Sequence, residues 1–134
     1  MYHDGTAFVV LCALTRNTMT LGVPRAGLLA LGLILAFVGS GVKVWAAVRL
    51  GNDAFFWRDF FAVNGSGTPS VRGPYRFLKN PMYTVGYLNT YGLALLLASY
   101  PGLIAAAFGH FAILVFFNVV EKPHFASLAR RDAA

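Results

Sequence analysis

Three long apolar runs constrain the fold of this chain more than any other feature of its sequence. The first is bracketed by Arg25 and Leu50, the second extends over 81–97, and the third extends over 103–120. A helix needs roughly 20 predominantly apolar residues to cross the hydrocarbon core of a bilayer. The runs therefore predict an all-α integral membrane helical bundle with three transmembrane helices, of which the last two form a C-terminal hairpin.

Composition agrees with a membrane protein and argues against a soluble one. Hydrophobic residues make up 57% of the 134 residues and charged residues only 12%, whereas ordinary soluble domains carry about 25% charged residues. A single domain spanning 1–134 has too little interior to hide so much apolar surface from water. The net charge of +6 does not indicate nucleic-acid binding, because the basic residues fall in the gaps between apolar runs.

Those basic residues are distributed unevenly, and their distribution predicts an orientation. The connection over 49–81 carries five of them, whereas the turn at 98–102 carries none. The five are Arg49, Arg58, Arg72, Arg76 and Lys79. Cytoplasmic connections of membrane proteins carry an excess of Lys and Arg. We therefore expect the long connection and the C-terminus to face the cytoplasm.

Two shorter segments accompany the long runs. Thr6 to Leu14 is apolar but too short to span a bilayer, so it is either an interfacial segment or the remnant of a longer span. Residues 53–61 place five aromatic side chains among charges. Aromatic rings prefer the headgroup level of a membrane, so this segment predicts a short interfacial helix.

Small and charged residues in the first run carry further expectations. Gly32, Gly39 and Gly41 provide small faces, for which close packing of helices is the favoured interpretation. Lys43 falls near the far end of the run, where a long side chain can extend to the headgroups.

Helix geometry predicts which polar residues of the hairpin lie at the same depth. Asn80 precedes Tyr100 by 20 residues and Glu121 follows it by 21. Because a helix rises about 1.5 Å per residue, both reach nearly the same level. We expect the approach to the second run and the end of the third to meet at the cytoplasmic membrane surface. Such a meeting would suit a soluble cofactor and a lipid-borne substrate.

The same reasoning applies to polar residues within the hairpin. Asn89 and His110 lie at similar distances from the turn, and buried polar side chains in lipid need partners. A hydrogen bond between them is favoured over a catalytic role for His110. Tyr83, Tyr87 and Tyr91 recur every four residues and share one helical face. They either pack or offer an aromatic wall to a cation such as a sulfonium.

The stretch Gly-Pro-Tyr-Arg-Phe-Leu-Lys-Asn-Pro-Met-Tyr over 73–83, followed by two apolar spans and then Glu-Lys-Pro-His-Phe over 121–125, resembles a known family. It is similar to the phospholipid N-methyltransferase and isoprenylcysteine carboxyl methyltransferase superfamily. The Asn-Pro-Met-Tyr form is closest to the phosphatidylethanolamine N-methyltransferase branch. Weaker similarity extends backwards, so the resemblance covers about residues 28–128.

The resemblance implies a cofactor, S-adenosylmethionine, bound between the last two spans and the C-terminal segment, and it implies no metal site. Carried over by position, the cofactor-site residues are Arg76, Asn80, Tyr83, Gly86, Glu121 and His124. Arg76 suits the methionine carboxylate, Glu121 suits the ribose hydroxyls or the amino group, and Tyr83 suits the sulfonium. His124 or Glu121 would take the proton from an amine nucleophile.

The acceptor implied by the resemblance is a lipid amine such as phosphatidylethanolamine, or another amphipathic molecule. The alternatives are a thiol or isoprenylcysteine carboxyl methyltransferase and a non-enzymatic or degenerate relative. The degenerate alternative rests on Lys122, which stands where the family often has a second Glu, and on the short tail. A small multidrug-type transporter is disfavoured because Glu121 falls at a surface. Whether the protein forms a homo-oligomer to close its site stays open.

Overall fold

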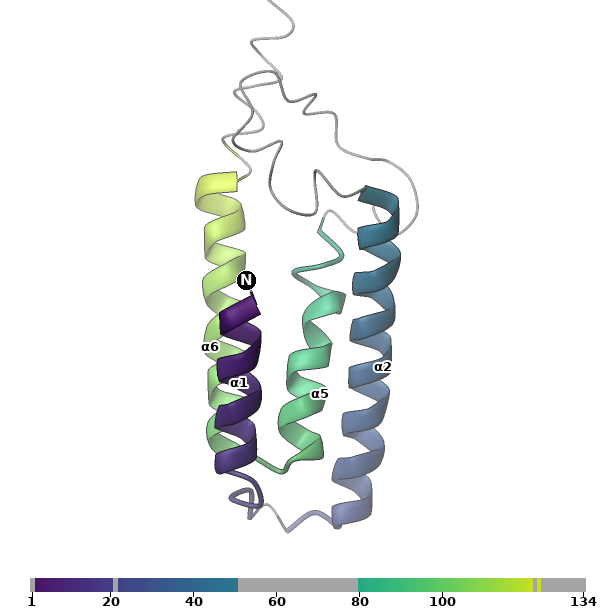
Figure 1. The fold of residues 1–134 in the computed structure, drawn as a ribbon, viewed down its shortest axis with the longest axis vertical. Coiled ribbons are helices and arrows are strands. Elements are labelled where there is room, and N and C mark those ends of the chain that lie inside the picture. The colour runs from purple at the N-terminus through teal and green to yellow at the C-terminus, as the bar shows by residue number, and fades with distance from the viewer. Residues whose placement is uncertain (1, 21, 51–79, 122, 124–134) are drawn as a thin grey trace, which may run out of the picture.

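The structure is a computed structural model that describes residues 2–20, 22–50, 80–121 and 123. In this part of the chain every regular element is a helix, which confirms the predicted all-α class for these residues (Figure 1). The α-helices are α1 (Tyr2–Leu14), α2 (Arg25–Leu50), α5 (Leu88–Leu96) and α6 (Tyr100–Phe116), and two short turns are 3₁₀ (η2, Val85–Tyr87) and π-helical (η3, Phe117–Glu121). The predicted interfacial helix over 53–61 lies outside the described residues.

The long elements stand side by side, with α5 between α2 and α6 (Figure 1). The chain rises through α2, descends through α5 and rises again through α6, so α5 and α6 form the predicted antiparallel hairpin. As a result α5 has two packed faces, one toward α2 and one toward α6.

The α2–α5 interface is built from small residues. A Cβ atom on Gly92 would lie 2.7 Å from the carbonyl oxygen of Gly32, and a Cβ on Gly39 would collide with the backbone nitrogen of Asn89. Glycines let helix backbones approach this closely within a membrane. The packing interpretation is therefore confirmed for Gly32 and Gly39. It is wrong for Gly41 as far as the described residues go, because none of their atoms lies within 4 Å of a Cβ built there.

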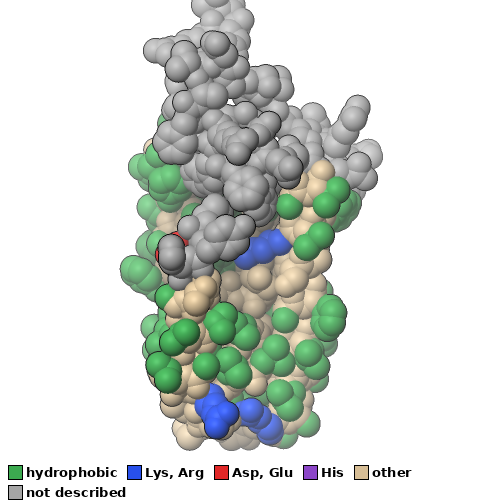
Figure 2. Space-filling model, viewed as in Figure 1, with side chains coloured by type: hydrophobic (Ala, Val, Ile, Leu, Met, Phe, Trp, Pro, Cys, Tyr) green, Lys and Arg blue, Asp and Glu red, His purple; other side chains and the backbone are tan. Residues whose placement is uncertain are grey.

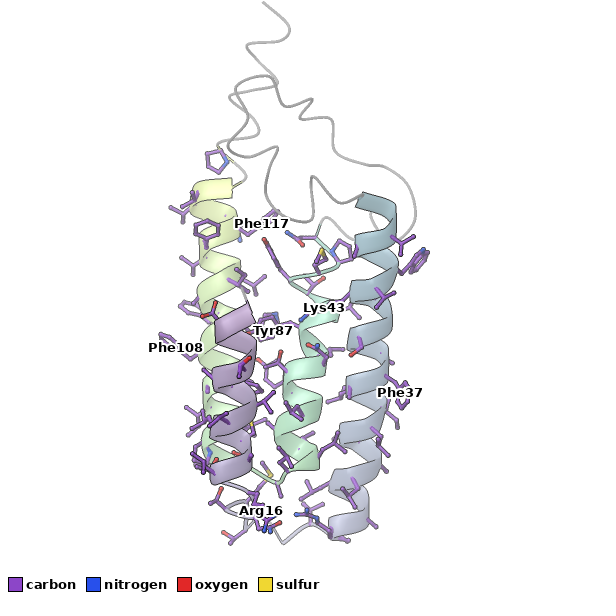
Figure 3. All side chains as sticks on the ribbon, viewed as in Figure 1. Arg16, Phe37, Lys43, Tyr87, Phe108 and Phe117 are labelled. Carbon is purple, nitrogen blue, oxygen red and sulfur yellow. The ribbon has the colours of Figure 1, made fainter. Side chains whose placement is uncertain are left out.

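Among the described residues, two helical segments are long and apolar enough to cross a membrane, Arg25–Val48 and Tyr100–Val120. Their large apolar side chains face outward, as in Phe37 and Phe108, which are 76% and 74% exposed and project away from the bundle (Figure 3). A soluble protein would bury such surfaces. The second expected span, over 81–97, contains only the nine residues of α5 in regular α-helix, so a third continuous transmembrane helix is not found there.

The third run begins its helix earlier than the sequence predicts. We expect a start near 103, but α6 begins at Tyr100 because Ser99 caps it. The Ser99 hydroxyl accepts a hydrogen bond from the Gly102 N–H at 2.9 Å, and Pro101 occupies the first turn, where its missing N–H costs nothing. The tight turn is consequently shorter than expected.

The N-terminal segment is an upright helix. α1 runs along the bundle beside α6 (Figure 1), and the choice between an interfacial segment and the remnant of a longer span stays open. The residues that follow α1 tie it to the α5–α6 turn. The Asn17 and Met19 N–H groups donate to the carbonyls of Leu97 and Ala98, each at 3.0 Å. These bonds fix the end of the bundle opposite to the expected site.

Candidate functional site

The expected cofactor residues Asn80, Tyr83 and Gly86 lie on an irregular turn that precedes α5. The Asn80 side-chain oxygen accepts a hydrogen bond from the Tyr83 N–H at 3.3 Å, so Asn80 caps this turn and the fully buried Pro81 follows it. The turn then breaks at Thr84, whose φ of −98° and ψ of −96° are not helical. Regular α-helix begins only at Leu88.

Backbone groups in this break find partners despite the loss of regular helix. The Gly86 N–H donates to the Pro81 carbonyl at 2.8 Å, and the Tyr87 N–H donates to the Thr84 carbonyl at 3.1 Å. The Tyr87 N–H therefore does not donate to the Tyr83 carbonyl oxygen, as it would in a regular α-helix. The Nε2 atom of His110 in α6 lies 2.9 Å from that oxygen instead. Non-helical backbone at membrane depth persists only where neighbouring protein groups satisfy it. The break is thus held in place from α6.

His110 is engaged on three sides. Because a carbonyl oxygen only accepts, we assign the ring proton to Nε2, which donates to Tyr83 O, while Nδ1 accepts from the Tyr91 hydroxyl at 3.2 Å. The imidazole also stacks on the Tyr87 ring, with centroids 4.6 Å apart and planes 10° apart. These contacts give His110 a structural role in joining α5 to α6.

The predicted hydrogen bond between Asn89 and His110 is wrong. The Asn89 side-chain oxygen instead accepts from the Lys43 ammonium at 3.0 Å. Successive helical residues are rotated by about 100°, so Asn89 lies about 200° from both Tyr87 and Tyr91. Those tyrosines face α6, and Asn89 consequently faces α2.

The expectation that Lys43 extends to the headgroups stays a prediction. Its side chain turns inward across Gly86 and ends at Asn89 and the face of the Tyr87 ring, 5.7 Å from the centroid (Figure 3). In a helix the Cα–Cβ bond points toward the N-terminus. A lysine near the C-terminal end of α2 is therefore directed back into the bundle.

The tyrosine stripe packs against α6 over its whole length. The Tyr87 and Tyr91 rings surround His110, and the Tyr83 ring meets the Phe117 ring edge-on at a centroid distance of 6.1 Å. The packing interpretation is therefore confirmed for the described contacts. The pair of Tyr83 and Phe117 brings the start of the hairpin beside the end of α6, as the depth argument predicts.

The structure describes the predicted site residues unequally. Asn80, Tyr83 and Gly86 lie together on the broken turn, and Glu121 is the last residue of η3. Arg76 and His124 lie outside the described residues. The space beside Gly86 is already filled, since a Cβ there would lie 2.9 Å from Lys43 Cγ. The absence of a Cβ on Gly86 thus leaves room for the Lys43 side chain.

Sequence reasoning missed a pocket of about 460 Å³ between α1, α2 and α5. Its lining residues are Asp4, Gly5, Phe8, Val9, Lys43, Tyr87, Asn89, Thr90 and Leu93. The one available signal was a lysine inside an apolar run, because ionisable residues within spans usually serve function. The contribution of α1 could not be anticipated from the sequence.

Replacing His110 by leucine should destabilise the bundle by about 2 kcal/mol. The change removes two hydrogen bonds, one of them from the His110 ring to the part-buried Tyr83 carbonyl. Thermal denaturation in detergent, followed by circular dichroism, measures the effect. Phe108→Leu on the exposed face of the same helix is the matched control. Equal melting temperatures for the two variants would contradict the structural role of His110.

Comparison with known proteins agrees with the sequence motif. The family described as phospholipid methyltransferase matches residues 28–129. Similar curated proteins are the phosphatidylethanolamine N-methyltransferases of Clavispora lusitaniae, at 39% identity over 72% of this chain, and of Debaryomyces hansenii, at 32% over 92%. The enzyme of the same name from Meyerozyma guilliermondii is 32% identical over 96% of the chain.

These matches cover most of this chain but only a small part of each relative. The chain spans only 11%, 15% and 16% of the length of these three relatives, in the order given above. No solved structure matches the chain. The family match nevertheless covers most of the sequence, including the broken turn, α5 and α6. By this match and these identities, the chain belongs to the phospholipid methyltransferase family.

Proposed function

We propose that this membrane protein transfers a methyl group from S-adenosylmethionine to the amine of a membrane phospholipid, with phosphatidylethanolamine as the acceptor class. The observation that carries the proposal is the family match over residues 28–129. It includes the broken turn with Asn80 and Tyr83 and the end of α6 beside it. The names of the similar curated proteins support the same acceptor.

The proposed membrane arrangement has three crossings. Residues 80–97, as the broken turn plus α5, would supply the middle crossing, since α5 packs against both of the long apolar helices, α2 and α6. The excess of basic residues in the 49–81 connection supports a cytoplasmic site and C-terminus. Residues 1–134 would act as one membrane-embedded domain.

The side chains of the proposed site suit the chemical groups of S-adenosylmethionine. The Tyr83 ring stands at the level of Phe117, and aromatic faces of this kind attract a sulfonium cation. Arg76 would pair with the methionine carboxylate, and Glu121 and His124 would bind the polar groups of the nucleoside. Asn80 orients the turn on which Tyr83 lies, by accepting its N–H.

Catalysis in this proposal comes mainly from positioning. S-Adenosylmethionine supplies an electrophilic methyl group and leaves as the neutral thioether S-adenosylhomocysteine. The lipid amine nitrogen forms the new C–N bond while the S–C bond breaks, so holding the two in line supplies most of the rate. The proton that the amine loses passes to Glu121 or His124, directly or through water.

Methylation of reconstituted vesicles tests this function. Vesicles that contain phosphatidylethanolamine and the purified protein should convert methyl-labelled S-adenosylmethionine into labelled methylated phosphatidylethanolamines. Vesicles of phosphatidylcholine alone, whose nitrogen is already fully methylated, should stay unlabelled. The absence of labelled lipid from both phosphatidylethanolamine vesicles and a total lipid extract would refute the proposed activity.

A further inference from the structure

The pocket between α1, α2 and α5 is lined by both charged and apolar residues. Lys43 of α2 and Asp4 of α1 are the charged ones. Phe8, Val9 and Leu93 contribute to its apolar lining. Figure 2 shows a blue patch in a hollow at the height where Figure 3 labels Lys43. The volume of about 460 Å³ falls in the range of small-molecule sites.

The Lys43 ammonium has unused hydrogen-bonding capacity. One of its three donors goes to the Asn89 side-chain oxygen at 3.0 Å, and the Tyr87 ring face lies 5.7 Å away. Within the described part of the chain, no carboxylate lies within ion-pair distance of it. A cation inside a span is costly unless an anion or water meets it. The remaining donors of the Lys43 ammonium therefore suit an anionic group with several acceptor oxygens.

The position of Lys43 along the membrane suits a lipid phosphate. Lys43 follows Arg25 by 18 residues in one continuous helix, which corresponds to roughly 27 Å along the axis. The two residues therefore mark opposite boundaries of a hydrocarbon core of roughly 30 Å. Lys43 lies toward the same end of the bundle as the broken turn and Phe117 of η3 (Figure 3). Phosphodiester groups of one leaflet reach this level.

We propose that this pocket binds the zwitterionic headgroup of a phospholipid, with Lys43 holding the phosphodiester. Asp4, which lines the same pocket, disfavours headgroups with net negative charge and favours those that carry an ammonium beside the phosphate. The apolar lining accommodates the glycerol backbone and the start of the acyl chains. The inference rests on the proposed function, because it names how the acceptor lipid is held near the methyl-transfer site.

The path of the Lys43 side chain supports a built site. Gly86 has no Cβ, and this absence lets the Lys43 stem pass and place its ammonium beside Asn89. Thr90 donates to the same Asn89 oxygen at 3.2 Å, so the amide is held from two sides. Gly86, Asn89 and Thr90 therefore position the Lys43 ammonium of α2.

Lys43→Met tests the proposal, because it keeps the aliphatic stem against Gly86 and removes only the ammonium. The matched control is Arg25→Met, which removes one positive charge from the other end of α2, where Arg25 donates to Asn17 at 2.7 Å. In nanodiscs, Lys43→Met should raise the KM for phosphatidylethanolamine about tenfold, while S-adenosylhomocysteine binds with unchanged Kd. Arg25→Met should leave both constants close to those of the original protein.

Lipid retention provides a readout that does not depend on activity. Native mass spectrometry should detect phosphatidylethanolamine bound to the original protein and to Arg25→Met, with about tenfold less on Lys43→Met. Lys43-dependent retention without any methyl transfer would support the pocket and refute the proposed function. Equal retention and equal KM for all three proteins would overturn the inference.

Three further results would also overturn it. If Lys43→Met weakens S-adenosylhomocysteine binding and leaves lipid retention intact, Lys43 belongs to the cofactor site. If inorganic phosphate displaces the lipid from the original protein and from Arg25→Met alike, the pocket recognises free phosphate rather than a headgroup. Retention of phosphatidylglycerol equal to that of phosphatidylethanolamine would refute the role of Asp4.

Discussion

Replacing Gly39 by leucine is expected to force α2 away from α5 and to destabilise the bundle by about 3 kcal/mol. A Cβ at this position would collide with the backbone nitrogen of Asn89, which cannot move without shifting the helix. Displacement of Asn89 would also break its hydrogen bond to Lys43. The effect therefore extends from helix packing to the pocket. Thermal denaturation of the purified protein in detergent measures it.

Gly41→Leu is the matched control for this prediction. The same change occurs two residues along the same helix, so its effect on helix propensity is the same. No atom of the part of the chain that the structure describes lies within 4 Å of a Cβ built on Gly41, so a leucine there would meet none of the described helices. We expect a melting temperature close to that of the original protein. Comparable losses of stability in both variants would refute close α2–α5 packing.

Exchange of Arg76 for alanine or of Glu121 for glutamine is expected to weaken S-adenosylmethionine binding about 100-fold. In the proposed site the guanidinium meets the methionine carboxylate, and the Glu121 carboxylate accepts hydrogen bonds from the cofactor. Charged partners that lose water on binding cost several kcal/mol when one is removed. Calorimetric titration of each variant gives the change in Kd.

The controls for these variants are Arg72→Ala and Asp132→Asn, which remove a charge of the same sign elsewhere in the chain. Both should bind the cofactor like the original protein. A helical circular dichroism spectrum shows that each variant is folded. If Arg76→Ala and Glu121→Gln both bind normally, the assignment of these residues to the cofactor site is wrong.

The sequence could predict depth in the membrane but not direction around a helix axis. The count of residues from the turn predicts that Asn80 and Glu121 reach the same level, and the neighbouring Tyr83 and Phe117 rings are in contact. The same count places Asn89 level with His110, but Asn89 faces α2. Depth follows from the rise per residue alone. Direction also requires knowing which neighbour each face of α5 meets.

The shortening of α5 depends on contacts that are distant in sequence. The break before Leu88 is stabilised by His110 from α6, and Gly86 makes room for a side chain of α2. No local propensity indicates either contact, so the continuous span predicted over 81–97 could not be corrected from the sequence. The early start of α6, in contrast, follows from a local signal, the Ser99 cap before Pro101.

The candidate site follows from motifs, and its full assembly remains a prediction. Asn80 and Tyr83 share the turn that the motif indicates, whereas Arg76 and His124 lie outside the described residues. The pocket at Lys43 could not be predicted, because Asp4 reaches it only through the packing of α1 along the bundle.

Binding of S-adenosylhomocysteine to the purified protein tests the central claim most directly. Isothermal titration calorimetry in detergent, with S-adenosylmethionine as a second ligand, requires neither a known acceptor nor turnover. Our account predicts saturable binding of both ligands in the micromolar range. Failure of both to bind a protein with a well-folded helical spectrum would contradict it. The family motif would then serve only as a scaffold in this chain.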